Sequence, residues 1–282
     1  MVFKRYDIVV IGNCTEDRLP TNNGVVSRLG GSPSYISSLL STLGVKYGVY
    51  SKVWSEFPFL RELSFKPLPN SPEIKPLVCR LLNETTGKNH VFLTSSEKIQ
   101  PEDIDFSSKI SIISGVMREV PPETIEKVCE RSDVTIVDTQ MMMRGLDSEG
   151  NVFLKKLSET EYSNVIHLFD YLKVSEAEFR FLDINPLNKT KILLTLGPKG
   201  CKIIANNREK HILTMPLKEI ESNGSGDMFL AGFAYGLLNG CDEETAAKIG
   251  NYCGGLAVRA VGVPKLSKKE IEIIKEMAKN VI

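Results

Sequence analysis

Short apolar runs rich in β-branched residues alternate with helical patterns along almost the whole chain. This alternation is typical of βαβ units, because each helix returns the chain to the start of the next parallel strand. The sequence therefore predicts an α/β fold with a mainly parallel sheet. The predicted strands are Asp7–Ile11, Tyr47–Val53, Ile110–Ile113, Val134–Asp138, Val165–Phe169, Lys191–Leu196, Cys201–Ala205 and His211–Thr214.

The predicted helices begin at residues that suit a first helical turn. Pro33 follows Ser32 and Pro122 follows Pro121, and proline fits there because the N–H that it lacks would have no partner in the helix. Ser175 has a side chain that can cap the helix after it. The predicted helices are Ser34–Leu43, Glu123–Arg131, Glu176–Leu182, Asp227–Asn239, Asp242–Val258 and Ser267–Lys279.

One region departs from this alternation. From residue 73 to 95 the pattern is a strand (Ile74–Leu82), a glycine-containing loop and a second strand (His90–Thr94). Together with a strand near residues 22–29, this hairpin predicts a small sheet that covers a cleft or pairs with a second copy of the chain. An antiparallel edge of the main sheet is the alternative interpretation.

Composition limits the kind of protein. The 282 residues are enough to bury a large core in a single domain that spans residues 1–282. Lys and Arg together number 35, as do Asp and Glu, so the formal net charge is zero and nucleic acid is not expected as a partner. No stretch approaches the roughly 18 apolar residues that span a bilayer, which predicts no membrane partner and a cytoplasmic location. The six scattered cysteines indicate reduced, mostly buried side chains.

The most informative local motif is Glu221-Ser222-Asn223-Gly224-Ser225-Gly226-Asp227, which an apolar helical run follows at once. A Gly-x-Gly turn lets backbone N–H groups converge, and the N-terminus of the next helix adds partial positive charge. These features predict an anion site suited to phosphate, with Asp227 positioned to accept a proton from a substrate hydroxyl. A tight turn that caps a buried helix is the alternative interpretation.

Four segments, in family order along the chain, resemble the signatures of the ribokinase-like (PfkB) family of sugar and nucleoside kinases. They are Gly30-Gly31-Ser32-Pro33-Ser34-Tyr35, Lys173-Val174-Ser175-Glu176-Ala177-Glu178, Leu194-Thr195-Leu196-Gly197-Pro198-Lys199-Gly200 and the motif from Glu221 to Asp227. The resemblance implies a three-layer αβα sandwich with a central, mainly parallel sheet and a small β-sheet lid.

The resemblance also implies roles at the phosphoryl donor. Gly224, Ser225 and Gly226 would form the anion hole, and Asp227 would be the catalytic base. Glu178 would act on Mg²⁺ through water, which suits a strongly hydrated cation. The positions implied at the nucleotide or its metal ion are Ser175, Glu178, Thr195, Gly197, Gly200 and Asn251.

On the acceptor side, the resemblance implies contacts from Asn13, Asp17, Gly30, Gly31, Tyr35, Gln140 and Arg144. A carboxylate such as Asp17 accepts two hydrogen bonds from a diol. Tyr35 stands where the family usually has Asn, and Trp54-Ser55-Glu56 replaces a Gly-x-Asp. The acceptor pocket is therefore expected to have a different shape.

The sequence thus predicts transfer of the γ-phosphoryl group of ATP, with Mg²⁺, to a hydroxyl of a small polyol-like substrate: a sugar, a cyclitol such as inositol, or a nucleoside. The choice of acceptor, the choice of donor, and a monomer or a homodimer through the lid all stay open. No P-loop motif, no Gly-x-Gly-x-x-Gly after the first strand and no Gly-x-Ser-x-Gly elbow occurs, which disfavours P-loop kinases, Rossmann dehydrogenases and serine hydrolases. The alternative from another class is a non-catalytic sugar or nucleotide sensor that keeps the kinase fold.

Overall fold

The computed structural model describes residues 4–21, 24–69, 78–84, 87–92, 97–184, 189–215 and 217–279. Its centre is an eight-stranded sheet in the order β14-β13-β12-β11-β8-β7-β1-β4. All neighbouring pairs from β4 to β12 are parallel, whereas β13 is antiparallel to both of its neighbours. The strands are β1 (Lys4–Ile11), β4 (Tyr47–Tyr50), β7 (Phe106–Ile113), β8 (Ser132–Asp138), β11 (Tyr171–Ser175), β12 (Lys191–Thr195), β13 (Cys201–Ala205) and β14 (Arg208–Ile212).

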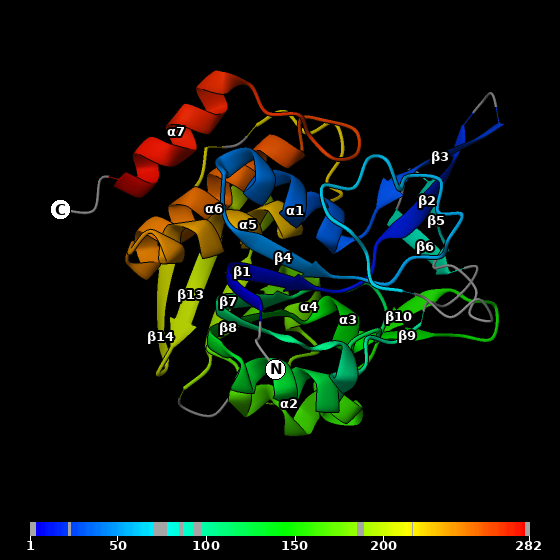
Figure 1. The fold of residues 1–282 in the computed structure, drawn as a ribbon, viewed down its shortest axis with the longest axis horizontal. Helices are drawn as coiled ribbons and strands as arrows, with labels where there is room; N and C mark the ends of the chain where they lie inside the picture. Colours follow the sequence, from blue (N-terminus) through cyan, green and yellow to red (C-terminus); the bar gives the residue numbers. More distant parts are fainter. Residues whose placement is uncertain are drawn as a thin grey trace.

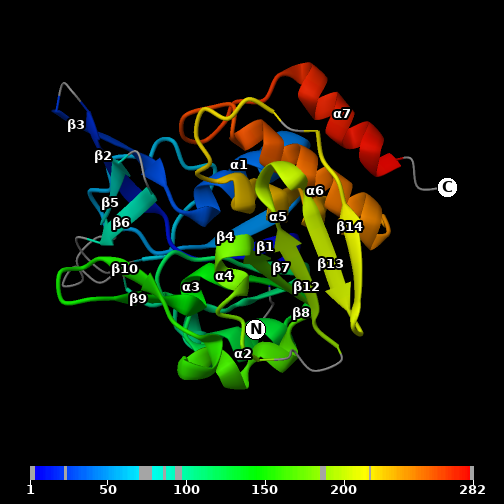
Figure 2. The same cartoon turned by 180° about the vertical axis from the view of Figure 1, so that it is seen from behind.

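Helices cover both faces of this sheet (Figure 1), and Figure 2 shows the same layers from behind. One face packs on α1 (Ser32–Leu43), α5 (Ser225–Leu238), α6 (Glu243–Ala257) and α7 (Lys268–Lys279), and the other on α2 (Pro122–Glu130) and the short α3 (Gln140–Met143). In β1, Ile8 and Val10 join the first core cluster, while Val9 and Ile11 join the second. A strand buried on both faces requires such an uninterrupted apolar run. The predicted three-layer α/β fold is confirmed.

A second sheet of four strands stands to one side of the main body, in the order β3-β2-β5-β6 (Figure 1). Its strands are β2 (Thr15–Thr21), β3 (Gly24–Gly30), β5 (Val78–Glu84) and β6 (Gly87–Phe92). The predicted hairpin therefore leaves the main sheet, and its placement as an edge of that sheet is wrong. Parts of its predicted strands, residues 74–77, 93 and 94, lie outside the described residues. Strand β2 escaped prediction because its sequence, Thr-Glu-Asp-Arg-Leu-Pro-Thr, is mostly polar.

The strand predicted at Val165–Phe169 is wrong. That stretch contains the 3₁₀ turn Ile166–Leu168, and its apolar side chains pack into the core cluster beneath α2. The central strand is β11, which pairs with β8 and β12. A lysine in its middle, Lys173, interrupts the apolar pattern and hides the strand from sequence reasoning.

The last strand also begins earlier than predicted, at Arg208 instead of His211. Asn206 and Asn207 both have positive φ angles, 50° and 58°. Two consecutive left-handed residues form the tight turn that best matches the twist of a hairpin, and asparagine tolerates that conformation. The turn therefore lets β14 pair with β13 from its first residue, Ala205 opposite Arg208.

A second small hairpin, which the sequence did not predict, follows α3. Its strands β9 (Arg144–Leu146) and β10 (Val152–Leu154) are antiparallel, and β10 contacts lid strand β6. In Figures 1 and 2 this hairpin lies beside the lid. Arg144 is its first residue, and the charge of this arginine acts on Asp17 of lid strand β2.

The double-sided burial of the sheet makes a stability prediction. Ile112 of β7 is fully buried, and Ile112→Ala leaves a cavity that should lower the free energy of unfolding by about 2–5 kcal/mol, measured by urea denaturation. Val25→Ala, at a position 62% exposed on β3, is the control and should change it by less than about 0.5 kcal/mol. Equal effects of the two substitutions would contradict the assigned core.

Candidate active site

The predicted anion site lies at the N-terminus of α5. Gly224 is the N-cap residue, with φ 75° in the left-handed region, and Ser225 begins the helix. The Ser225 hydroxyl donates to the Ser222 carbonyl oxygen at 2.8 Å, which holds the turn closed. Backbone N–H groups of a first helical turn have no partner four residues earlier, so they are free to face an anion.

Asp227 lies inside this first turn. Ser114, directly after β7, donates to its Oδ1 at 3.4 Å, and Ser32 at the start of α1 also bonds to it. Burial raises the pKa of the Asp227 carboxyl, and these two hydroxyls with the charges of Lys173 and Arg144 oppose that rise. A carboxylate with a raised pKa is a better proton acceptor than an ordinary aspartate.

Four of the six positions predicted at the nucleotide or its metal ion, Thr195, Gly197, Gly200 and Asn251, line one pocket beside the α5 N-terminus. Gly200, between β12 and β13, has φ 90°, and a Cβ there would lie 2.2 Å from the Ile212 carbonyl oxygen, so only glycine fits. Asn251 of α6 donates to the same carbonyl oxygen at 3.0 Å and so ties α6 to β14. The pocket is lined by Thr195, Gly197, Pro198, Gly200, Thr214, Met215, Leu217, Glu219, Ser222, Ser225, Gly226, Phe229, Asn251, Gly254, Gly255 and Val258.

Four of the predicted acceptor residues, Asp17, Gly30, Gly31 and Tyr35, lie where the lid strands meet α1 and the end of β1. Asp17 of β2 lies against Gly30, whose missing Cβ would be 2.3 Å from the Asp17 carboxyl. Thr15 donates to Asp17 Oδ1 at 2.6 Å. Burial raises the pKa of Asp17, and the charges of Arg28 and Arg144 counteract it.

Gly31 lies between lid strand β3 and α1, against the backbone of residues 13–15. Its φ is 82°, and a Cβ there would lie 2.6 Å from the Asn13 carbonyl oxygen and 2.9 Å from the Thr15 nitrogen. Only glycine lets the chain between β3 and α1 pass this close to the end of β1. The close approach brings the lid strand, α1 and β1 to one point.

Tyr35 is the link between the acceptor region and the anion site. Its ring lies on Gly224, where an added Cβ would be 2.1 Å from Tyr35 Cε1. The residue is only 2% exposed, and its hydroxyl has no hydrogen-bond partner. Charges on Asp17 and Arg28, and that on Asp227, act on this hydroxyl. A buried, unpaired hydroxyl between the two halves of the site is suited to bind a ligand oxygen.

Three further predicted acceptor residues mainly hold the loops of the site. The side-chain amide of Asn13 bonds to the backbone of Lys52 at 2.7 Å and of Glu97 at 2.9 Å. Gln140 Nε2 donates to the Gly115 carbonyl oxygen at 3.2 Å, and Arg144 donates to the Val116 carbonyl oxygen at 3.2 Å.

This arrangement of donor pocket, anion site and lidded acceptor region was compared with known proteins. The pfkB family of carbohydrate kinases matches residues 79–269, about two thirds of the chain. The chain belongs to the PfkB family of carbohydrate kinases. It is therefore a phosphotransferase with an alcohol group as acceptor, and the alternative of a non-catalytic sensor has no support.

Named relatives and solved structures agree with this family assignment. The kinase is 31% identical over 280 residues to inositol 3-kinase of Arabidopsis thaliana, covering 95% of this chain and 78% of that one. It is 28% identical to inositol 3-kinase of Zea mays over 95% of this chain and 76% of that one. A pyrophosphate-dependent kinase of the ribokinase family, complexed with a pyrophosphate analogue and myo-inositol, has the same fold, with a TM-score of 0.75 at 19% identity over 94% of this chain and 99% of that one.

The kinase's Ser175 and Glu178 lie at the start of α4 (Glu176–Phe179), apart from the donor pocket lining. The Ser175 N–H and hydroxyl donate to Glu178 Oε2 at 2.8 and 2.7 Å. Burial opposes the charge of Glu178, but Lys173 and the two Ser175 hydrogen bonds outweigh it and lower its pKa. Glu178 is thus a buried carboxylate that stays ionised.

Sequence reasoning did not foresee that the fold would pair Lys173 with Asp138. Lys173 and Asp138 form a buried ion pair on adjacent strands. The available signal was a single charged residue within or at the end of an apolar strand, since such a charge is rarely buried without a partner.

It also missed the tie between the lid and the anion site. Arg28 of β3 pairs with Glu221 through its two terminal guanidinium nitrogens, Nη1 and Nη2. Glu221 also accepts from the Asn223 side-chain amide at 2.6 Å. This bidentate pair fastens the lid strand to the loop that precedes Gly224.

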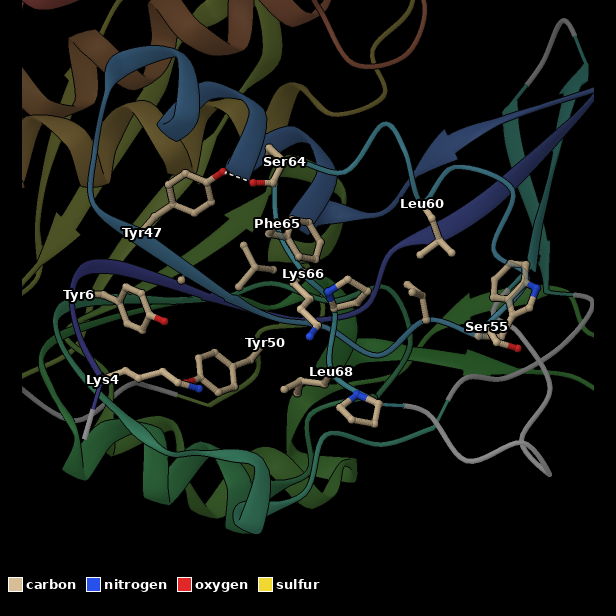
Figure 3. A pocket seen from close by; sticks show the side chains of 16 residues that line it. Lys4, Tyr6, Tyr47, Tyr50, Ser55, Leu60, Ser64, Phe65, Lys66 and Leu68 are labelled. Atoms are coloured by element: carbon tan, nitrogen blue, oxygen red, sulfur yellow. Dashed lines mark hydrogen bonds between the residues drawn. The ribbon is translucent and has the colours of Figure 1, made fainter. Parts of the chain in front are cut away.

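A separate cavity of about 950 Å³ lies beside edge strand β4 (Figure 3). The segment that follows β4 bridges it, since the Tyr47 hydroxyl donates to the Ser64 carbonyl oxygen at 2.8 Å and the Leu68 N–H donates to the Ser51 carbonyl oxygen at 2.8 Å. Its lining includes Tyr6, Tyr50 and Phe65 but none of the predicted site residues.

Across the described part of the chain, no helix has the length and apolar character to cross a membrane.

The crowding at Gly31 makes a testable prediction. Gly31→Ala adds a Cβ in left-handed backbone and against backbone atoms, so it should lower the free energy of unfolding by at least about 3 kcal/mol in urea denaturation. Gly44→Ala is the matched control, because its φ is 77° but open space surrounds it, and it should cost about 1–2 kcal/mol. Equal losses would show that backbone conformation alone requires glycine at residue 31.

Proposed function

We propose that this kinase transfers the terminal phosphoryl group of a nucleoside triphosphate to a hydroxyl of inositol or a closely similar cyclitol. One observation carries the proposal: Asp227 lies in the first turn of α5, directly after pocket residues Ser225 and Gly226, and both Asp227 and Asp17 act electrostatically on Tyr35. The names of the most similar relatives, inositol 3-kinases, support the choice of acceptor.

In the proposed reaction, the acceptor hydroxyl gives its proton to the Asp227 carboxylate as its oxygen bonds to the terminal phosphorus. The bond from that phosphorus to the bridging oxygen breaks, and its electron pair leaves with the diphosphate. N–H groups of Gly226 and Asp227 donate to the phosphoryl oxygens, whose charge the α5 N-terminus stabilises. Because the pKa of Asp227 is raised, proton transfer to it is easier than to an ordinary aspartate.

Acceptor recognition is proposed to centre on Asp17. Thr15 holds one carboxylate oxygen, and the absence of a side chain at Gly30 leaves room for the carboxyl. Inositol carries a hydroxyl on every ring carbon, so adjacent hydroxyls can both donate to one carboxylate. Tyr35 would add one hydrogen bond from its unpaired hydroxyl.

The donor pocket favours a nucleotide over pyrophosphate. Besides Ser225 and Gly226, the pocket is lined by the apolar side chains of Met215, Leu217 and Phe229 and by Gly254 and Gly255. The planar, apolar faces of a nucleotide base could pack against these side chains, whereas pyrophosphate has no apolar group that could contact them.

The residues near the donor are compatible with Mg²⁺ held through water. No cluster of three or more potential ligands occurs in the described part of the chain, and Mg²⁺ usually keeps several waters with one or two carboxylates. Glu178, buried and ionised, would supply the carboxylate. When bound, Mg²⁺ neutralises phosphate charge.

The kinase is also proposed to form a homodimer through its lid. Strand β3 is an edge of the four-stranded sheet, and its Val25 and Val26 are exposed. An exposed apolar edge strand is a ready surface for a second sheet of the same kind.

The first test is a coupled phosphotransfer assay with ATP or pyrophosphate against myo-inositol, ribose, fructose and adenosine. Phosphorylation of myo-inositol with ATP is expected. Asp227→Asn should lower kcat by at least about 1,000-fold and leave ATP affinity nearly unchanged, because only the proton acceptor is lost. Wild-type kcat should also fall at low pH, with a midpoint above the ordinary aspartate value of 3.8, since protonated Asp227 cannot act as base.

Asp242→Asn is the matched control for that substitution. Asp242 caps the next helix, α6, by accepting from the Thr245 N–H at 2.7 Å, and asparagine caps a helix equally well. The Asp242→Asn variant is therefore expected to have the kcat of the wild-type kinase. Full activity of Asp227→Asn would remove Asp227 from the mechanism, and preference for another acceptor would replace inositol.

Tyr35→Phe tests the acceptor contact. Loss of a buried, unpaired hydroxyl should raise the free energy of unfolding of the free kinase by about 1–3 kcal/mol, while KM for inositol rises about 5- to 10-fold because one hydrogen bond to the acceptor is lost. Urea denaturation and steady-state kinetics measure the two effects. A more stable variant with unchanged KM would mean that Tyr35 does not touch the acceptor.

A further inference from the structure

The buried ion pair beneath the anion site is the feature from which we draw a further inference. Lys173 of β11 and Asp138 of β8 lie opposite each other in the sheet register, with Nζ 3.0 Å from Oδ2. Their side chains are 6% and 2% exposed. The N–H of Gln140 donates to the other Asp138 oxygen at 3.0 Å, so the carboxylate is held on both sides.

Lys173 reaches beyond its partner to the anion site itself. A Cβ on Gly226 would lie 2.9 Å from Lys173 Nζ and 3.3 Å from its Cε. The ammonium therefore lies against the second residue of α5, next to Asp227. Gly226 does not have a positive φ angle, so backbone conformation does not explain glycine at this position. The ammonium of Lys173 explains it, because a side chain at residue 226 would meet that group.

The charges around this point explain why a fixed cation matters there. Three carboxylates face Lys173 from different elements: Asp138 from β8, Glu178 from α4 and Asp227 from α5. Arg144, at the start of β9, is the other cation that acts on Glu178 and Asp227. With both cations the five side chains sum to about one negative charge, and without Lys173 they sum to about two, so a phosphate would be repelled more strongly. A helix N-terminus contributes only roughly half a positive charge and cannot offset them alone.

We propose that Lys173 is the fixed cation of the anion site. Its ammonium offsets part of the carboxylate charge where it lies against the N-terminus of α5, so that this turn can hold the phosphoryl group being transferred, and glycine at residue 226 leaves room for the ammonium. Asp138 keeps the ammonium in position. This inference rests on the proposed function, because it assigns the phosphoryl group to the α5 N-terminus.

A purely structural role for Lys173 predicts a different outcome. In that case the lysine only neutralises Asp138, and removing both charges together would restore a normal site. Removal of a buried ion pair as a unit is often neutral for stability, whereas removal of one partner is strongly destabilising. The double variant Lys173→Met/Asp138→Asn therefore separates the two roles in a folded protein.

The experiment measures the affinity for inorganic pyrophosphate by isothermal titration calorimetry, without an acceptor, and then kcat and KM for ATP and inositol. For Lys173→Met/Asp138→Asn we expect wild-type stability in urea, pyrophosphate binding about 10- to 100-fold weaker, and kcat at least about 100-fold lower, with KM for inositol little changed. Lys173→Arg, which keeps the charge, should bind pyrophosphate more tightly than the double variant. Wild-type pyrophosphate affinity and kcat in the double variant would overturn the proposal.

Gly226→Ala provides a second test of the contact between residues 173 and 226. The added methyl meets the flexible end of Lys173 and should displace the ammonium, which weakens pyrophosphate binding. In the Lys173→Met/Asp138→Asn background, the same Gly226→Ala change should have a much smaller effect, because the two sites are coupled. Equal effects in both backgrounds would mean that Gly226 serves the backbone alone and would contradict the assigned contact.

A control with the same charge changes is available at the first residue of the neighbouring strand β12. Lys191 of β12 pairs with Glu243 of α6, and Lys191→Met/Glu243→Gln should leave pyrophosphate affinity at the wild-type value. Wild-type protein that binds pyrophosphate but phosphorylates no acceptor would count against the proposed function and leave the test of Lys173 intact. Wild-type protein that binds no pyrophosphate would overturn the role of Lys173.

Discussion

The whole site depends on one constraint: the parallel strands are buried on both faces, so most polar groups of the site lie where the strands end. Cys14 and Thr15 follow β1, Ser114 follows β7, Asp138 ends β8 and Ser175 ends β11. Parallel strands bring these ends to one edge of the sheet, and ligands of open α/β sheets bind at that edge. The N-terminus of α5 meets the same edge, so the helix dipole and the side chains act on one point.

Close packing of backbone against backbone completes this edge. Gly31 lets the chain between the lid and α1 approach β1, and Gly200 lets the turn after β12 approach β14. Gly224 and Gly226 receive side chains instead, the ring of Tyr35 and the ammonium of Lys173. The four glycines therefore have different physical reasons, although all lie in segments that carry the family resemblance.

The site is also mechanically linked to the lid. Asp17 and Arg28 belong to neighbouring lid strands, and Arg28 is fastened to Glu221 just before the anion site. The Tyr35 ring lies on Gly224 at the same junction. The lid strands and the N-terminus of α5 are thus held together at one junction, and in the proposed reaction this would favour the fixed geometry that phosphoryl transfer requires.

The sequence by itself determined the α/β class, most helices and strands, and the α5 motif, because each depends on local patterns of apolar residues, glycine and capping side chains. It also singled out Thr195, Gly197, Gly200 and Asn251 as candidate donor residues, and the fold gathers these four into one pocket. The sequence did not predict strand β11, because a lysine in a strand indicates a surface position unless its buried partner, Asp138 of β8, is known. Polar strand β2 looked like a loop because its sequence is mostly polar and one of its two partners, β5, is distant in the chain. Only the tertiary structure decided that Lys173 lies against Gly226 and that the Tyr35 hydroxyl has no partner. Such contacts join residues far apart in sequence, and no local propensity encodes them.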